Sequence, residues 1–272
     1  MKKDRILKNS LKGLLNKFAE NDVIAALEKE YSAEPSRQIP ASLIDDTPFI
    51  KKVKIPKETL DRFASSILKN GVFSPLIVRP KGNHYELVLG RKRFQGGKRA
   101  GLKEFPCVII DESDEVVLLT LLADTRDQRE SNVVEMALIC QTLYTRFGYT
   151  QESLGKLSHQ SRSQITNTLR ILRLPDDILD DICLGKLSYG HAKAVASLSE
   201  SEIRDLVKRV YEENLSVREV EAIARKEGGK NTTKSPKYSI KDHGKSLTIT
   251  FESEEEKAKF LKRIAKQVSF CI

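Results

Sequence analysis

The sequence predicts an α+β protein built from several domains, and three observations support this. Strand-like and helix-like patterns alternate through residues 38–124, residues 125–227 carry helix patterns alone, and residues 237–272 place two short strand patterns before an apolar helix. The length of 272 residues also fits more than one domain, at ~100–200 residues each. We therefore expect a small mixed α/β domain, an all-helical domain and a short ββα module, in that order.

Composition and charge narrow the class of protein. Charged residues make up 31% and hydrophobic residues 39%, which is apolar enough for the chain to fold. The net charge of +9 favours nucleic acid, a nucleotide or anionic lipid as the partner. No apolar run reaches the ~18–20 residues of a membrane span, so we expect a cytoplasmic protein. The scattered cysteines and histidines favour buried thiols and give no metal cluster.

Residues 1–37 predict a basic amphipathic arm. Its first 17 residues hold six lysines and arginines against one acid, Asp4. Apolar residues recur there at spacings of three and four, which predicts a helix with a lysine-rich face. The alternative is a solvated arm that docks loosely.

Residues 38–124 predict the mixed domain. The Lys81-Gly82-Asn83 turn lies between two runs rich in β-branched and aromatic residues, which predicts a hairpin, and Asn70-Gly71 is a helix stop. The elements expected are, in chain order, a helix over Thr59–Lys69, strands over Leu76–Val78, Tyr85–Leu89 and Cys107–Ile110, and a helix over Glu115–Ala123.

Within the helical residues 125–227, the segment 149–170 has the spacing of a helix-turn-helix. Thr150 can cap a first helix, residues 158–160 turn, and Ser161 with Gln164 has the spacing of a capping box for a second helix. Ile165, Leu169 and Leu172 would then face the core. The side chains left pointing outward are those of Arg162, Ser163, Thr166, Asn167 and Arg170.

Such an outward polar face suits the major groove of DNA, whose bases and phosphates it can contact. The alternative is an ordinary helix pair with a solvated face. Downstream, a helix starting near Ser188 would present free backbone N–H groups at Gly190 and His191, which suits a phosphate. For His191 alone, a packing role is an equal alternative.

The sequence predicts a linker at residues 228–236 and a dimerisation module at residues 237–272. Residues 228–236 are rich in glycine, threonine and lysine, which indicates a flexible linker. Residues 237–272 are too few to bury a core alone, because domains below ~40 residues usually need a metal, a disulfide or a partner. The apolar stripe expected at the dimer seam consists of Ala258, Leu261, Ile264, Ala265 and Val268.

Several of these motifs, in this order, resemble the ParB family of chromosome and plasmid partition proteins. Thr150–Leu174 is similar to the family's helix-turn-helix, and Leu187–Ala194 to its GHARA element. Asn70–Pro80 resembles the first nucleotide box, with Ser74 where the family usually has Gln. Gly90–Gln95 stands where the family has GERRxR.

The resemblance implies a dimer that binds a centromere-like, parS-like inverted repeat and uses CTP to close into a clamp on DNA. It also implies a ParA-type ATPase as partner of the N-terminal arm, where Leu11–Leu15 resembles the family's segment, and a nucleoid-associated location. The implied DNA-binding residues are Ser161, Arg162, Ser163, Gln164, Thr166, Asn167, Arg170, Arg173, Gly190, His191 and Lys193. The implied nucleotide-binding residues are Gly71, Ser74, Pro75, Gly90, Arg91, Lys92, Arg93, Gln95, Arg126 and Arg129.

This chain departs from the family pattern in its nucleotide boxes. The Glu of GERRxR is Arg91 and its last Arg is Gln95, while the family's ENxxR aligns with residues 125–129 and keeps only Arg129. Mg²⁺ prefers carboxylate oxygens, which only Asp124 or Asp127 could supply nearby. We therefore expect a basic loop at Gly90–Gln95 that binds CTP, with hydrolysis weakened or lost.

Two other classes stay open at the level of sequence. A nucleoid-occlusion relative would share the DNA and CTP modules but hold a membrane through residues 1–20. An enzyme on the same N-terminal fold would be a nuclease or a sulfiredoxin-like phosphotransferase. A nuclease usually needs clustered carboxylates that hold a metal, and a sulfiredoxin-like enzyme needs a cysteine in the Gly90–Gln95 loop. The sequence shows neither feature.

Overall fold

The computed structural model describes residues 35–127, 132–228, 238–242, 247–251, 253, 254 and 257. Its contacts divide the chain into two compact units, Met1–Glu221 and Ala222–Ile272. Nearly all of the predicted arm, Arg129 and the whole apolar stripe at 258–268 lie outside the described residues. The predictions made for them stay predictions.

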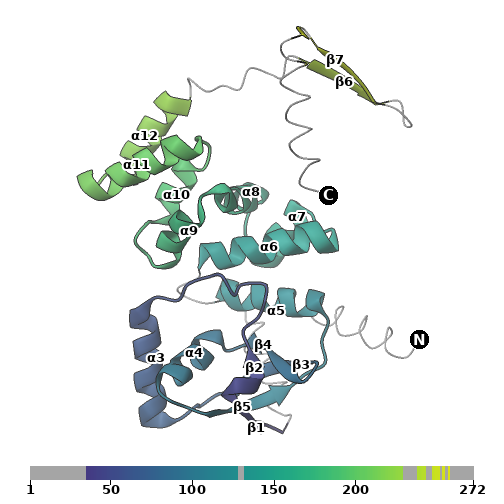
Figure 1. The fold of residues 1–272 in the computed structure, drawn as a ribbon, viewed down its shortest axis with the longest axis vertical. Coiled ribbons are helices and arrows are strands. Elements are labelled where there is room, and N and C mark those ends of the chain that lie inside the picture. Colours follow the sequence, from purple (N-terminus) through teal and green to yellow (C-terminus); the bar gives the residue numbers. More distant parts are fainter. Residues whose placement is uncertain are drawn as a thin grey trace. The chain divides into compact units, whose positions relative to one another are not determined.

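The first unit contains the predicted mixed domain, built on a five-stranded sheet of order β1-β5-β3-β4-β2 (Figure 1). The predicted hairpin is confirmed, since β3 and β4 pair antiparallel around Gly82. The pairs β3–β5 and β4–β2 are parallel, and β1–β5 is antiparallel. The strands are β1 Arg37–Pro40, β2 Ile44–Asp45, β3 Leu76–Lys81, β4 His84–Leu89 and β5 Glu104–Ile109.

Two helices, α3 (Lys57–Asn70) and α4 (Arg91–Arg99), pack on each other, and α4 packs on this sheet through Phe94. The rings of Phe94 and Phe105 meet edge to face with centroids 5.2 Å apart. Gly96 and Gly97 allow the close approach, because a Cβ at Gly96 would lie 2.6 Å from the Phe63 Cβ, and one at Gly97 would collide with the Phe105 ring. Helix α4 is therefore held tightly in the core.

The remainder of the first unit is helical, as predicted, up to the start of α12. Helix α5 runs from Asp114 to Asp127, past the predicted end at Ala123 and across the boundary expected at residues 124 and 125. The following helices are α6 Val133–Phe147, α7 Gln151–Ser158, α8 Arg162–Arg170, α9 Asp176–Cys183, α10 Tyr189–Val195, α11 Glu200–Glu213 and α12 Val217–Gly228. Short 3₁₀ turns lie at Ala41–Leu43 and Ile171–Arg173.

The second unit contains an antiparallel hairpin of β6 (Tyr238–Asp242) and β7 (Leu247–Phe251), in register from the Tyr238–Phe251 pair to the Asp242–Leu247 pair. These strands agree with the two strand patterns predicted there. Helix α12 ends at Gly228, where the linker was expected to begin. In the part of the chain that the structure describes, no helix is long and apolar enough to cross a membrane.

Candidate functional sites

The predicted helix-turn-helix is α7 and α8, joined by a tight turn. Thr150 accepts a hydrogen bond from the Ser153 backbone and caps α7. His159, with φ of 54°, adopts the left-handed conformation that ends α7. A Cβ at Gly155 would lie 2.7 Å from the Gln160 carbonyl oxygen, so glycine lets the chain turn back closely over α7.

The second helix begins with the predicted capping box. The Ser161 backbone N–H donates to Gln164 Oε1 at 2.7 Å, and the Gln164 N–H donates to Ser161 Oγ at 3.2 Å. Ile165 is buried, whereas Leu169 is only partly so. Of the predicted DNA-contacting side chains on α8, those of Arg162, Ser163, Gln164 and Thr166 are exposed, and those of Asn167 and Arg170 are partly buried.

Gln151, at the start of α7, belongs to this surface and was not predicted. Thr166 Oγ1 donates to Gln151 Oε1 at 2.8 Å, and it also approaches the Arg162 carbonyl. The first residue of α7 therefore orients a side chain of the second helix. Only the position of Gln151 on the facing helix could have signalled this role.

His191 is half-buried, and both of its ring nitrogens are bound by the protein, which favours the packing alternative. Its Nε2 lies 3.1 Å from the Leu215 carbonyl oxygen and its Nδ1 lies 3.0 Å from Ser188 Oγ. Because a carbonyl only accepts, Nε2 carries the proton and Nδ1 accepts from the hydroxyl. The His191 backbone N–H, expected to be free for a phosphate, donates to Ser188 Oγ. Lys193 is exposed, and its carbonyl accepts from Arg170.

The predicted basic loop at Gly90–Gln95 is a helix start, and the loop prediction is wrong. Gly90 adopts the left-handed conformation, with φ of 98°, and α4 begins at Arg91. The first hydrogen bond within α4 runs from the Phe94 N–H to the Gly90 carbonyl, so the backbone N–H groups before Phe94 make no bond within the helix. Such groups, together with the helix dipole, suit an anion.

The arginines of this helix start mainly bind the protein itself. Arg91 Nε donates to Asp46 Oδ2 at 2.8 Å, and Arg91 Nη2 donates to the Val53 carbonyl at 2.9 Å. Arg93 Nη1 donates to the Ser74 carbonyl at 2.7 Å and to the Pro75 carbonyl at 3.0 Å. These bonds explain why the predicted nucleotide residues at 74, 75 and 90–93 lie together.

Three other predicted residues of the nucleotide set, Gln95, Arg126 and Gly71, are placed differently. Gln95 Nε2 lies 3.5 Å from Asp46 Oδ2, on the side of Arg91. Arg126 Nη1 lies 3.3 Å from the Leu157 carbonyl and 3.3 Å from His159 Nε2, so it contacts the end of α7. Gly71 ends α3 with φ of 72°. The side chain of Asp127 lies outside the description.

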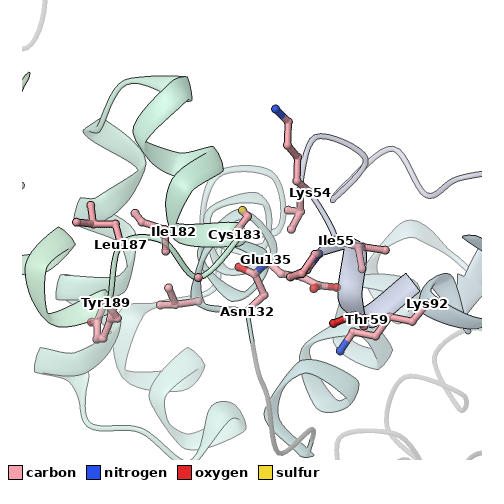
Figure 2. A pocket seen from close by; sticks show the side chains of 14 residues that line it. Lys54, Ile55, Thr59, Lys92, Asn132, Glu135, Ile182, Cys183, Leu187 and Tyr189 are labelled. Carbon is pink, nitrogen blue, oxygen red and sulfur yellow. The ribbon is translucent and has the colours of Figure 1, made fainter. Parts of the chain in front are cut away.

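A cavity of about 300 Å³ lies between the mixed domain and the helices that follow it (Figure 2). In Figure 2, Lys92 and Thr59 border one side, and Ile182, Leu187 and Tyr189 border the other.

Glu135, in the first turn of α6, lines this cavity and was not predicted. Burial raises its pKa to about 7, and the charge of Asp124 adds to the effect, while Arg91 and Lys92 oppose it. Arg91, Asp124 and Glu135 come from three different helices, α4, α5 and α6, so no single local motif could have signalled this cluster.

No group of three metal-ligating side chains occurs among the residues that the structure describes. Cys107, Cys140 and Cys183 are buried free thiols, as predicted. Burial raises the pKa of Cys107 and of Cys140 to about 12, which makes these thiols unreactive at neutral pH.

Comparison with known proteins identifies the family. Residues 25–125 match the ParB N-terminal domain and residues 129–228 match the ParB HTH domain. The chromosome-partitioning protein ParB of Caulobacter vibrioides is 33% identical over 218 residues, which cover 79% of this chain and 71% of that protein. The chain belongs to the ParB family.

Among solved structures, this ParB-family chain is similar to two from Caulobacter crescentus. One is C-terminally truncated ParB bound to the centromeric parS site, with 33% identity, coverage of 70% of this chain and 100% of that one, and a TM-score of 0.43. The other is truncated ParB bound to CTP-γ-S, with 30% identity, coverage of 65% and 98%, and a TM-score of 0.32.

Proposed function

We propose that this chain is a partition protein that binds a parS-like inverted repeat through α7 and α8. The observation that carries the proposal is the capped helix α8, which presents Arg162, Ser163 and Thr166 to solvent while Ile165 anchors it in the core. Such a surface matches what a recognition helix needs to contact base edges and phosphates. Membership of the ParB family supports the same role.

The proposed DNA-binding set includes the half-buried Asn167 and Arg170 and the exposed Lys193, with Gln151 as a residue that orients Thr166. Arg173, at the end of the 3₁₀ turn after α8, is included as a candidate for the phosphate backbone. His191 and Gly190 act in packing instead, because His191 binds the Leu215 carbonyl and a Cβ at Gly190 would lie 2.9 Å from Val217.

An inverted repeat is read by two copies of a protein related by twofold symmetry. We therefore infer a homodimer, with residues 237–272 as its principal seam and the apolar stripe as its buried face. The β6–β7 hairpin agrees with the strand part of that module. The predicted arm, residues 1–37, is proposed to contact a ParA-type ATPase.

The start of α4 fits the triphosphate of CTP. Gly90 starts the helix in a left-handed conformation in which a Cβ would lie 2.7 Å from the buried Leu76, so only glycine fits there. The first turn of α4 presents backbone N–H groups, and Lys92 adds charge. Arg93 acts by fixing the Ser74–Pro75 loop against the helix start. Arg91 is assigned to positioning and not to phosphate contact, since Asp46 holds it.

The segment aligned with ENxxR does not fit Mg²⁺ equally well, because Thr125 and Arg126 stand where the family has the Glu and Asn that it uses around the ion. We accordingly propose CTP binding with slow hydrolysis or none. The acidic and amide side chains of ENxxR are replaced at Thr125 and Arg126, and phosphoryl transfer depends on positioning of that kind.

One experiment tests the DNA role and another tests the nucleotide role. Genomic footprinting of the full chain should give a few sharp peaks with kilobase shoulders over an inverted repeat. Isolated peaks without shoulders would instead indicate a plain repressor. Calorimetric titration with CTP and CTP-γ-S, beside a phosphate-release assay with cognate DNA, should show binding without turnover. An absence of heat with either nucleotide would rule out the nucleotide site.

The membrane-binding relative is tested separately. In sedimentation with anionic lipid vesicles, the full chain and a variant that lacks residues 1–20 should both stay in the supernatant. Co-sedimentation that depends on residues 1–20 would favour the nucleoid-occlusion reading.

A further inference from the structure

A further cavity, of about 240 Å³, lies among α6, the turn before α8, α8 itself and the start of α10. Val133 and Tyr189 also line the cavity of Figure 2, so the two cavities share a wall there. The further cavity contains no residue of the candidate nucleotide site. Its lining residues are Val133, Met136, Gln160, Gln164, Thr168 and Tyr189.

The side-chain amide of Gln160 is incompletely bonded in this cavity. Its oxygen, Oε1, is buried and has no hydrogen-bond partner among the residues that the structure describes. Its nitrogen, Nε2, donates to Met136 Sδ at 3.2 Å, and a thioether sulfur is a weak acceptor. A buried acceptor without a donor is costly, so Gln160 Oε1 favours a ligand that donates a hydrogen bond.

Two hydroxyl groups of the lining also have bonding capacity to spare. Thr168 is only 2% exposed, and its Oγ1 lies 3.5 Å from Tyr189 Oη. Hydrogen bonds between hydroxyl groups are typically ~2.7–2.8 Å long, so this contact is weak. Each hydroxyl can donate one hydrogen bond and accept two. The cavity therefore offers partners for a second polar group of a ligand.

The rest of the lining defines the charge, size and shape of the ligand. No acidic or basic side chain lines the cavity, so an ion would lose its hydration there without a counter-charge. At about 240 Å³ the cavity is smaller than the ~300–1,000 Å³ of sites for drug-sized ligands, which favours one or two rings. Val133 and Met136 supply apolar surface, against which water is unfavourable. Sulfur atoms and tyrosine rings both pack well against aromatic rings.

We propose that this cavity binds a neutral aromatic molecule of one or two rings whose N–H or O–H donates to Gln160 Oε1. Met136 and Tyr189 pack against its ring, and the Thr168 hydroxyl binds a second polar group where the molecule has one. Because Gln164 and Thr168 belong to α8, the bound molecule also contacts the candidate recognition helix. Binding needs neither DNA nor nucleotide, so this inference is independent of the proposed function.

The test compares two small ligands on the full chain. Indole is the probe, because it is a neutral two-ring molecule with one N–H. Benzofuran is the matched control ligand, since an oxygen that cannot donate replaces that N–H in a molecule of the same shape. Saturation-transfer difference NMR gives the dissociation constant of each ligand, without DNA or nucleotide in the sample.

Two variants change the cavity and two serve as controls. Gln160→Met removes the accepting oxygen at similar side-chain length, and Thr168→Leu adds bulk to the α8 wall. Gln141→Met is the matched control, because Gln141 is exposed on α6 and does not line the cavity. Lys92→Ala reports on the cavity of Figure 2, which Lys92 lines.

We expect indole to bind with a dissociation constant of about 0.1–1 mM, as fits so small a ligand. Benzofuran should bind about two- to ten-fold more weakly, which is the effect of one hydrogen bond. Gln160→Met should weaken indole by the same factor and bring it level with benzofuran. Thr168→Leu should abolish binding of both ligands, whereas Gln141→Met and Lys92→Ala should change neither.

Three results would overturn the proposal. Absence of a saturable indole signal would show that the cavity holds water only. Equal constants for indole and benzofuran, or an unchanged indole constant in Gln160→Met, would remove the bond to Gln160. Loss of indole binding in Lys92→Ala but not in Gln160→Met would assign the ligand to the cavity of Figure 2. The comparison of the two ligands uses the wild type, so it decides the proposal even where a variant fails to fold.

Discussion

Helices α4 and α8 are both nine residues long, and each begins and ends with arginine. Their first arginines have opposite environments. Arg91 is nearly buried in an ion pair with Asp46, whereas Arg162 is exposed. Arginine at the first position of a helix therefore does not by itself indicate a ligand contact, because the segment facing it decides its role.

The residues that precede the two helices explain part of this difference. Gly90 takes a left-handed conformation without a capping side chain and turns the start of α4 toward residues 46–53. Ser161 is in the extended region and caps α8 with its own hydroxyl. Helix α8 therefore starts without help from a distant segment, and its polar side chains stay available to a partner.

The largest effect expected from this comparison is on stability. Arg91→Ala leaves the Asp46 carboxylate nearly buried without its ion-pair partner, and breaking such a pair typically lowers the free energy of unfolding by ~3–5 kcal/mol. Denaturant unfolding of the full chain measures it. Arg162→Ala is the matched control and should change stability by less than ~0.5 kcal/mol. Equal effects of the two changes would contradict the distinction drawn between the helices.

The second effect is on DNA affinity, for which Arg162 is expected to matter more than Arg91. Arg162→Ala should weaken binding to the parS duplex by ~1–3 kcal/mol and relax selectivity at one half-site position, as expected for loss of a base contact. Lys208→Ala, an exposed position on α11, serves as the control. Unchanged affinity and selectivity in Arg162→Ala would remove α8 from the recognition role.

The same contrast explains what could be predicted from the sequence. The helix-turn-helix depends on bonds between near neighbours, such as Ser161 with Gln164, so its spacing is visible in the sequence. The hairpin of β3 and β4 is local as well. Strand β2, in contrast, has two residues and exists only through its pairing with β4. No periodicity can be read over so short a segment.

The start of α4 was missed for two reasons. Gly96 and Gly97 weaken its helix propensity, and their purpose, contact with Phe63 and Phe105, depends on tertiary packing. Arg91 was assigned to phosphate by family position, but its partner Asp46 lies 45 residues away. Long-range ion pairs leave no local pattern in one sequence.

A third effect tests the acidic side of the cavity next to α4. The pKa of Glu135 is raised from 4.5 to about 7, so the folded state keeps a proton that the unfolded chain loses. Stability should therefore fall as pH rises from ~4.5 to ~7, and stay level above that.

Glu135→Gln should flatten this pH profile and raise the free energy of unfolding at pH 8 by about 1–2 kcal/mol, since the cavity is open to some water. Denaturant unfolding between pH 5 and pH 8 measures the profile. Glu58→Gln, on the exposed start of α3, is the control. A profile that keeps its slope in Glu135→Gln would assign the titration to another group.

The smallest effect concerns the cap that distinguishes α8 from α4. Ser161→Ala removes the hydroxyl that accepts from the Gln164 N–H, and loss of such a cap lowers stability by ~1 kcal/mol. Ser161→Gly should lower it by only a few tenths of a kcal/mol, because glycine is itself tolerated at a helix start. Denaturant unfolding of both variants, with parS affinity measured in parallel, separates cap from contact. If Ser161→Ala weakened DNA binding with no loss of stability, the Ser161 hydroxyl would be a phosphate contact instead of a cap. The start of α8 would then be ordered by bound DNA, as the start of α4 is held by residues 46–53.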